Sequence, residues 1–250
     1  MDIIDEGINS YLEGDVNRVI RLFTTYLENG GIPLGHIYYY LGMAYSNIGK
    51  HTEAGTYFNK ALELEPEKGM YHYQLALVYA QLMLFQQAIP HLLKTLEQNP
   101  EHIFARVTLG KIYFKNGDMP LAAEHFRKIT EISPDYADGF YELGNSLYYQ
   151  GETPEAEKAF LRTVELNREH PDAYYKLGRL YAEAKDYERA TEYMRSAFRL
   201  GMDSLPFLSH FALVLLAAGQ KEQVMKLLKT AEETYPDSPE IVKIREMLSE

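Results

Sequence analysis

The chain has 250 residues, and 25 Lys and Arg side chains against 36 Asp and Glu give it a formal charge of −11 at pH 7. Apolar residues make up 46% of the chain and charged residues 24%, which is typical of a folded globular protein and excludes a mostly disordered one. The surplus of acid argues against binding to nucleic acid or to anionic lipid, because both need a surplus of Lys and Arg.

Several further classes are excluded by what the sequence lacks. It contains no Cys, so a disulfide framework, a thiolate metal site and a Cys nucleophile are ruled out. The N-terminal segment is acidic, without a basic stretch followed by an apolar run, so we expect no signal peptide. No stretch approaches the roughly 18 apolar residues that span a membrane, and the expected location is the cytoplasm.

The segment 1–34 predicts a helix hairpin. Gly14 and Asp15 mark a turn, and in the segment after it Val19 and Phe23 lie one helical turn apart on a single face.

From residue 35 onward, one pattern returns at a constant interval, without insertion or deletion. Its core is a large apolar residue followed by a small one: Leu41-Gly42, Leu75-Ala76, Leu109-Gly110, Leu143-Gly144, Leu177-Gly178 and Phe211-Ala212. Three residues after each small residue stand Tyr45, Tyr79, Tyr113, Leu147, Tyr181 and Leu215. Twelve after it stand Ala54, Ala88, Ala122, Ala156, Ala190 and Val224, and four further on stand Phe58, Leu92, Phe126, Phe160, Met194 and Leu228.

Each unit of this pattern predicts two antiparallel helices joined by a short turn. The small residue of the first helix lets the backbones approach closely, and the large residues fill the space around that contact. Four turns carry a Gly followed by a polar residue, at Gly49, Gly117, Gly151 and Gly219. After the last unit, residues 239–250 predict an amphipathic helix that starts at Ser238-Pro239 and places Ile241, Ile244, Met247 and Leu248 on one face.

This pattern resembles the tetratricopeptide repeat (TPR) family, whose 34-residue unit carries a Trp-x2-Leu-Gly-x2-Tyr … Ala-x3-Phe … Pro motif. The Trp position is never Trp here; it reads Tyr38, His72, Arg106, Phe140, Tyr174 and Leu208. The resemblance implies an all-α fold, a right-handed α-α superhelix of antiparallel helix hairpins. We expect six repeats at 35–68, 69–102, 103–136, 137–170, 171–204 and 205–238, with a degenerate N-terminal TPR-like hairpin at 1–34 and a C-terminal capping helix at 239–250.

Nothing in the sequence indicates catalysis or a metal site. It has no phosphate-binding loop, no nucleophile elbow and no His-Glu-x-x-His motif. The eight His residues form no pair at helical spacing and no tight cluster in the sequence, so we expect no metal and no cofactor. Acidic pairs such as Glu155 and Glu157 are interpreted as a solvated helix face.

The family resemblance also implies a concave groove, lined by the first helices of successive repeats, in which peptides bind. One column of groove positions reads Tyr39, Tyr73, Val107, Tyr141, Tyr175 and Ser209. Four Tyr in one column favour either a binding surface or packing between neighbouring repeats, and the sequence leaves both interpretations open.

The next column reads Met43, Leu77, Lys111, Asn145, Arg179 and Leu213. Lys115 lies one turn after Lys111, and Lys176 lies one turn before Arg179, which makes a local basic region in an acidic protein. We expect it either to capture an acidic peptide segment or to pair with nearby carboxylates such as Glu142 and Glu183. Tyr141 and Arg179 are the expected anchors.

The sequence therefore predicts a non-catalytic adaptor or scaffold that binds a peptide or protein segment in its groove. Two alternatives stay open: a scaffold that associates with itself through Gly30-Gly31 or its ends, and the recognition arm of a larger enzyme. The chaperone-binding subfamily is disfavoured, because its carboxylate-gripping Lys, Asn and Arg positions here hold Tyr39, Met43, Gln74, Phe104 and Thr108. Met83 and Leu84 replace the usual turn residues of the second repeat and are expected to be exposed.

Overall fold

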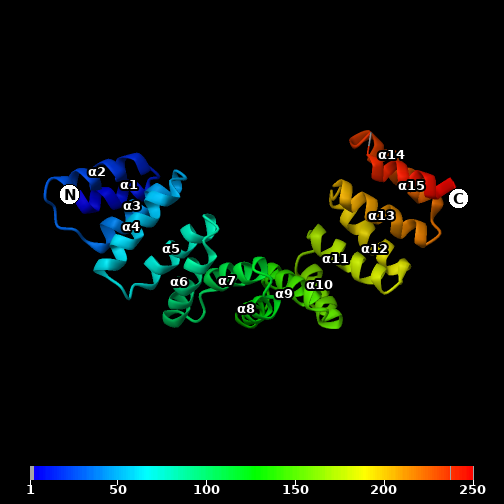
Figure 1. Cartoon of the computed structure of the whole chain (residues 1–250), viewed down its shortest axis with the longest axis horizontal. Helices are drawn as coiled ribbons and strands as arrows, with labels where there is room; N and C mark the ends of the chain where they lie inside the picture. The colour runs from blue at the N-terminus through cyan, green and yellow to red at the C-terminus, as the bar shows by residue number, and fades with distance from the viewer. Residues whose placement is uncertain (1–2, 237, 250) are drawn as a thin grey trace. The chain divides into compact units, whose positions relative to one another are not determined.

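The computed structural model describes residues 3–236 and 238–249, and all regular structure in those ranges is helical (Figure 1). The helices in chain order are α1 (Ile3–Leu12), α2 (Val16–Glu28), α3 (Gly35–Asn47), α4 (His51–Leu64), α5 (Gly69–Gln81), α6 (Phe85–Gln98), α7 (Ile103–Lys115), α8 (Met119–Ile132), α9 (Ala137–Gln150), α10 (Thr153–Leu166), α11 (Pro171–Glu183), α12 (Tyr187–Arg199), α13 (Leu205–Ala217), α14 (Lys221–Thr234) and α15 (Pro239–Ser249).

These helices form two compact units, Met1–His125 (unit 1) and Phe126–Glu250 (unit 2), and the boundary falls inside α8. Within each unit, consecutive helices pair as antiparallel hairpins, and neighbouring hairpins stack side by side (Figure 1). The predicted all-helical solenoid of helix hairpins is confirmed. The outermost ends of the predicted N- and C-terminal segments, residues 1–2 and 250, and residue 237 lie outside the described residues.

The turns inside the hairpins share one backbone conformation. A left-handed residue occurs at the same position of six successive repeats, at Gly49, Met83, Gly117, Gly151, Lys185 and Gly219. Glycine adopts this conformation without a side-chain clash, whereas Met83, at φ 60°, carries a cost of about 1–2 kcal/mol. The turn is therefore a fixed feature of the repeat, and two repeats tolerate a residue that is poorly suited to it.

A close contact joins the two helices of a hairpin. A Cβ built on Gly144 in α9 would lie 2.8 Å from the ring of Phe160 in α10, which is fully buried. Gly42 meets Phe58 in the same way, and so does Gly7 with Phe23 in the N-terminal hairpin α1–α2. The sequence separation between the glycine and the phenylalanine is the same in all three pairs, so this contact fixes the register between the two helices of a hairpin.

The C-terminal helix α15 packs on α13 and α14 through buried Ile241 and Ile244. The backbone N–H of Ile241 donates to the Ser238 hydroxyl at 3.4 Å, which caps the helix start. Met247 was expected on the buried face but is 43% exposed, because it lies six residues after Ile241 and so points to another side of the helix.

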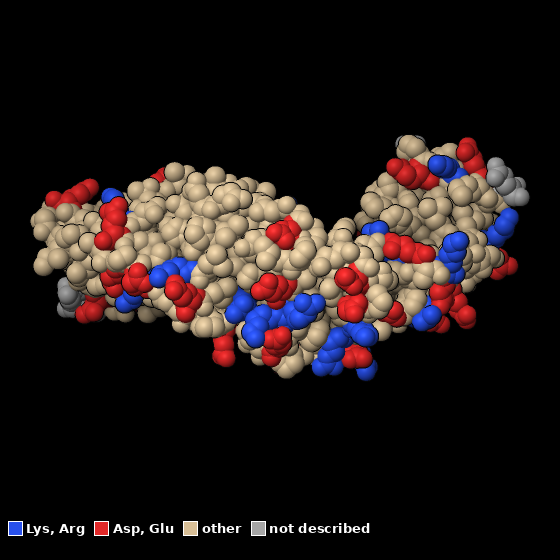
Figure 2. Space-filling view, turned by 60° about the horizontal axis from the view of Figure 1, so that its bottom comes forward, with Lys and Arg blue, Asp and Glu red and all other residues tan. Residues whose placement is uncertain are grey.

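Charged side chains of opposite sign gather in mixed groups on the surface, as Figure 2 shows along the lower edge of its view. Many are ion pairs between residues three apart on one helix, such as Lys128 with Glu131 at 2.7 Å. Exposed pairs of this kind contribute little to stability. Among the described residues, no helix combines the length and the apolar character needed to cross a bilayer.

Candidate functional site

The four tyrosines of the first predicted column all pack against the next repeat. Each ring contacts an aromatic ring near the start of the following first helix, with centroid separations of 5.2, 4.5, 4.6 and 5.4 Å for Tyr39–Tyr71, Tyr73–His102, Tyr141–His170 and Tyr175–Phe207. Burial raises the pKa of all four phenols. The packing interpretation therefore accounts for most of their ring surface, although each side chain remains partly exposed.

In unit 1 the residues of the second predicted column lie in two different environments. Met43 packs with Tyr39 on the core around Leu75 and Val78. Leu77, Lys111 and Lys115 instead line a surface pocket of about 400 Å³ together with residues of the exposed α5–α6 turn. That turn is apolar as expected, with Met83 62% and Leu84 41% exposed.

In unit 2 the structure brings six residues together on α9 and α11, which we call the α9–α11 surface: Tyr141, Asn145, Tyr148, Tyr149, Lys176 and Arg179. Lys176 Nζ lies 5.6 Å from the ring centroid of Tyr148 and 5.3 Å from that of Tyr149. Arg179 Cζ lies 5.5 Å from the Tyr148 ring, and its Nη2 donates to the Tyr148 hydroxyl at 3.1 Å. Two cations thus share one aromatic platform.

The charge of Arg179 is partly balanced. Its Nη2 lies 3.6 Å from Glu183 Oε1, and the Tyr148 hydroxyl donates to the same carboxylate. Burial and this hydrogen bond raise the pKa of Tyr148 to about 12. Pairing with a nearby carboxylate, one of the two alternatives for the basic region, therefore holds for Arg179.

Lys176 is different. Its side chain is half-buried, and burial, followed by repulsion from Arg179, lowers its pKa. It forms no ion pair within 4 Å in the part of the chain that the structure describes, and the two tyrosine rings lie against it. The more distant carboxylates of Asp172, Glu142 and Glu183 offset part of the fall in its pKa. A half-buried ammonium group without a carboxylate partner is a suitable site for an anion.

Asn145 supplies a second unsatisfied group. Its side chain is 6% exposed, and its amide hydrogen-bonds the phenol of Tyr141. Its Oδ1 has no hydrogen-bond partner among the described residues. A buried acceptor left without a donor costs about 1–3 kcal/mol, so this oxygen lowers the stability of the folded chain.

Helix α13, the first helix of the hairpin that follows α11–α12, places His210 beside this surface. The Tyr175 hydroxyl hydrogen-bonds His210 Nδ1, and their rings stack with centroids 6.0 Å apart. Burial, and then repulsion from Arg179, lower the pKa of His210. The lowered pKa favours the neutral imidazole over the imidazolium cation.

Sequence reasoning missed several of these contacts. Tyr148 and Tyr149 belong to neither of the two columns of groove positions. Only their position one turn after Asn145 on the same helix could have suggested that they contribute to the site. His72 and His91 were not expected to meet, yet their Nδ1 atoms lie 2.7 Å apart because α5 and α6 pack face to face.

The expectation that Glu157 lies on a solvated face is wrong. Tyr181 donates its hydroxyl hydrogen to Glu157 Oε1, which together with burial raises the pKa of Tyr181 to about 12. Residues of α10 and α11 are therefore linked by this carboxylate.

The α9–α11 surface offers two cations and aromatic faces, which suit the recognition of a ligand. The described residues include no group of three or more His, Asp or Glu side chains placed to hold a metal ion.

Known proteins agree with this architecture. Sequence models described as tetratricopeptide repeat match residues 37–68, 141–204 and 181–248, and one described as TPR repeat matches residues 110–151. No curated protein sequence matches the chain.

Among solved structures, the C-terminal part of a TPR repeat-containing protein from Cytophaga hutchinsonii is 16% identical with a TM-score of 0.82, covering 96% of this chain and 98% of that one. PilF of Pseudomonas aeruginosa is 19% identical with a TM-score of 0.70, covering 85% and 97%. YrrB, described as a TPR protein with an unusual peptide-binding site, is 24% identical with a TM-score of 0.65, covering 74% and 95%. These structural similarities establish the fold alone. The repeats matched by the sequence models show that the chain belongs to the tetratricopeptide repeat family.

Proposed function

We propose that the protein is a non-catalytic scaffold whose α9–α11 surface binds an acidic peptide segment of a partner protein. The observation that carries this proposal is the half-buried ammonium of Lys176, which lies against the rings of Tyr148 and Tyr149 without an ion pair within 4 Å among the described residues. An Asp or Glu side chain of the peptide would supply the carboxylate that Lys176 lacks.

The surroundings of Lys176 strengthen the attraction for a carboxylate. The rings of Tyr148 and Tyr149 exclude water from one side of the ammonium group, so a charge pair there is less screened than on an open surface. Arg179 adds positive potential, although Glu183 offsets part of it. Asp172, Glu142 and Glu183 act on Lys176 from a greater distance, and the ammonium group itself attracts an acidic side chain rather than a basic one.

Two further points support the proposal. TPR proteins are interaction scaffolds as a family, and YrrB, which shares the fold, is described as having a peptide-binding site. In unit 1 we propose the pocket beside Leu77, Lys111 and Lys115 as a second contact region, because it places apolar surface next to two cations. Tyr39, Met43 and Tyr73 then act mainly in packing.

The test uses arrays of degenerate peptides that differ only in their content of Asp and Glu. We expect binding of the wild-type protein to increase with acid content and to weaken as salt rises, since charges are screened over about 8–10 Å at ordinary ionic strength. Lys176→Met and Arg179→Glu should each weaken binding of the acidic peptides at least about tenfold. Lys115→Glu tests the region in unit 1 in the same way.

The matched control is Arg168→Glu. Arg168 is exposed between α10 and α11, and the change in charge equals that of Arg179→Glu. If the Arg168 and Arg179 variants lose binding equally, only net charge matters and the site is wrong. If neither Lys176→Met nor Arg179→Glu affects binding, the peptide binds elsewhere.

A further inference from the structure

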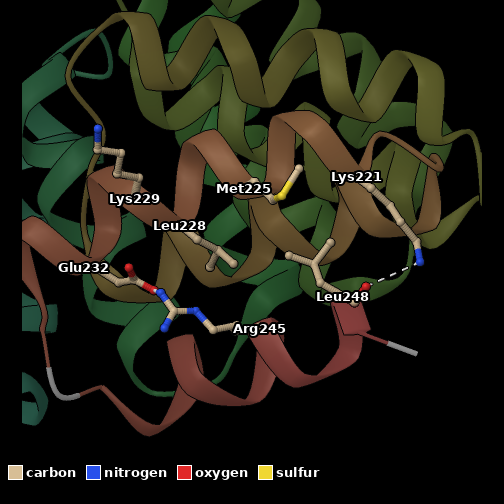
Figure 3. A pocket seen from close by; sticks show the side chains of 7 residues that line it. All are labelled: Lys221, Met225, Leu228, Lys229, Glu232, Arg245 and Leu248. Carbon is tan, nitrogen blue, oxygen red and sulfur yellow. Dashed lines mark hydrogen bonds and ion pairs between the residues drawn. The ribbon is translucent and has the colours of Figure 1, made fainter.

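The C-terminal end of unit 2 carries a surface pocket of about 530 Å³ between α14 and α15. In Figure 3, Glu232 of α14 and Arg245 of α15 point toward one another, and Lys221 of α14 donates a hydrogen bond to the backbone oxygen of Leu248 in α15 at 3.5 Å. Helix α14 contributes one face, with Lys221, Met225, Leu228 and Lys229 at positions i, i+4, i+7 and i+8. Helix α15 contributes Arg245 and Leu248.

This pocket is larger than two similar pockets of unit 2 because only two helices line it. Those two pockets have three helical walls: α8, α9 and α10 enclose one of about 240 Å³, and α12, α13 and α14 enclose one of about 220 Å³. In those pockets the third wall is the second helix of the following hairpin. No described helix occupies the corresponding position beside α14, where Met225 is 57% exposed.

The charges around the pocket define what a helix that docks there must carry. Glu232 is paired with Arg245, so its negative charge is already balanced. Lys221 and Lys229 mark the two ends of the α14 face, and neither forms an ion pair with a described residue. Between them lie Leu228 and Met225, the latter 57% exposed. The fitting partner is a helix with an apolar residue between two acidic ones.

The exposed face of α1 has this pattern. Asp5, Asn9, Leu12 and Glu13 follow one another at i, i+4, i+7 and i+8, the same spacing as on α14. Glu13 directly follows α1, and its backbone N–H keeps the helical hydrogen bond to Asn9 O at 2.9 Å. Leu12 is 74% exposed, and Asp5 and Glu13 form no ion pair within the described ranges.

The dimensions agree as well. Eight residues of α-helix span about 12 Å, so the two acidic groups of α1 and the two lysines of α14 are equally far apart. Both acids can meet a lysine whichever way the helices run, and in the parallel arrangement Leu12 lies opposite Leu228. We propose that α1 of a second copy of this chain docks in the α14–α15 pocket.

The association uses different surfaces on the two copies, so it is heterologous and can continue beyond a dimer. The association uses none of the residues of the α9–α11 surface. The proposal is therefore independent of the proposed peptide binding.

Sedimentation velocity over a concentration series tests the proposal. We expect the average mass of the wild-type protein to rise above that of the monomer with concentration, and to fall back at high salt. Lys221→Glu/Lys229→Glu and Asp5→Lys/Glu13→Lys should each raise the dissociation constant at least about tenfold. Mixing the two variants should restore association, because each then carries the surface that the other needs.

Lys158→Glu/Lys226→Glu is the control, since it makes the same change in charge outside the pocket. A wild-type protein that stays monomeric at every concentration overturns the proposal. So does association that survives in both reversed variants, or a mixture of the two that fails to associate.

Discussion

Substituting Gly144 tests whether its contact with Phe160 fixes the hairpin α9–α10. In a helix, Gly→Ala normally stabilises by about 0.5–1 kcal/mol, because alanine loses less backbone entropy on folding. At Gly144, however, the new Cβ would lie 2.8 Å from two atoms of the Phe160 ring. That ring is fully buried and cannot swing into solvent, so the helices must separate. Overpacking of this kind costs about 1–3 kcal/mol.

We therefore expect Gly144→Ala to destabilise the protein by about 1 kcal/mol and Gly144→Leu by up to about 3 kcal/mol. Thermal unfolding should show a fall in Tm of about 2–4 °C for each kcal/mol. The control is Gly55→Ala in α4, where the new Cβ would lie 3.5 Å from Val78 Cγ1, an ordinary contact. Gly55→Ala should raise Tm. The reasoning is refuted if the two alanine variants shift Tm in the same direction.

Three other predictions concern stability. Met83→Gly should stabilise by about 0.5–1 kcal/mol, because it relieves the left-handed backbone at φ 60°, and an unchanged urea midpoint would contradict that cost. Deleting residues 239–250 should expose the surface that Ile241 and Ile244 cover, so hydrogen exchange across residues 205–235 should accelerate; unchanged protection would show that α15 is not a cap. Stability should fall as the pH drops from 7.5 to 5.5, because burial lowers the pKa of His91, His125 and His210 in the folded chain, so the unfolded chain binds more protons in that range. His125→Phe should reduce that fall, and an equal fall in the variant would exclude His125 as a contributor.

The parts of the fold that recur in every repeat could be predicted from the sequence. One register predicts the positions of the turns, the small residue of each first helix and the aromatic residue that it contacts. The register holds because every repeat packs its two helices in the same way. Even Met83 and Lys185 adopt the turn conformation of the glycines that they replace.

The candidate site was predictable only in part. Lys176 and Arg179 were identified from their spacing on one helix, but their platform, Tyr148 and Tyr149, lies on another helix and depends on how α9 and α11 pack. Long polar side chains can reach several partners, and sequence spacing does not select among them. The pairing of His72 with His91 and of Tyr181 with Glu157 went unpredicted for the same reason.

The central claim, that the α9–α11 surface binds acidic peptides, is tested most directly by nuclear magnetic resonance of side-chain groups. An acidic peptide from the array would be titrated into isotope-labelled protein while the signals of the Asn145 amide and the Arg179 Nε–H are followed. We expect both signals to shift and saturate together, and the neutral analogue of the peptide to leave them unchanged. Saturable binding of the acidic peptide that leaves both signals in place would contradict it.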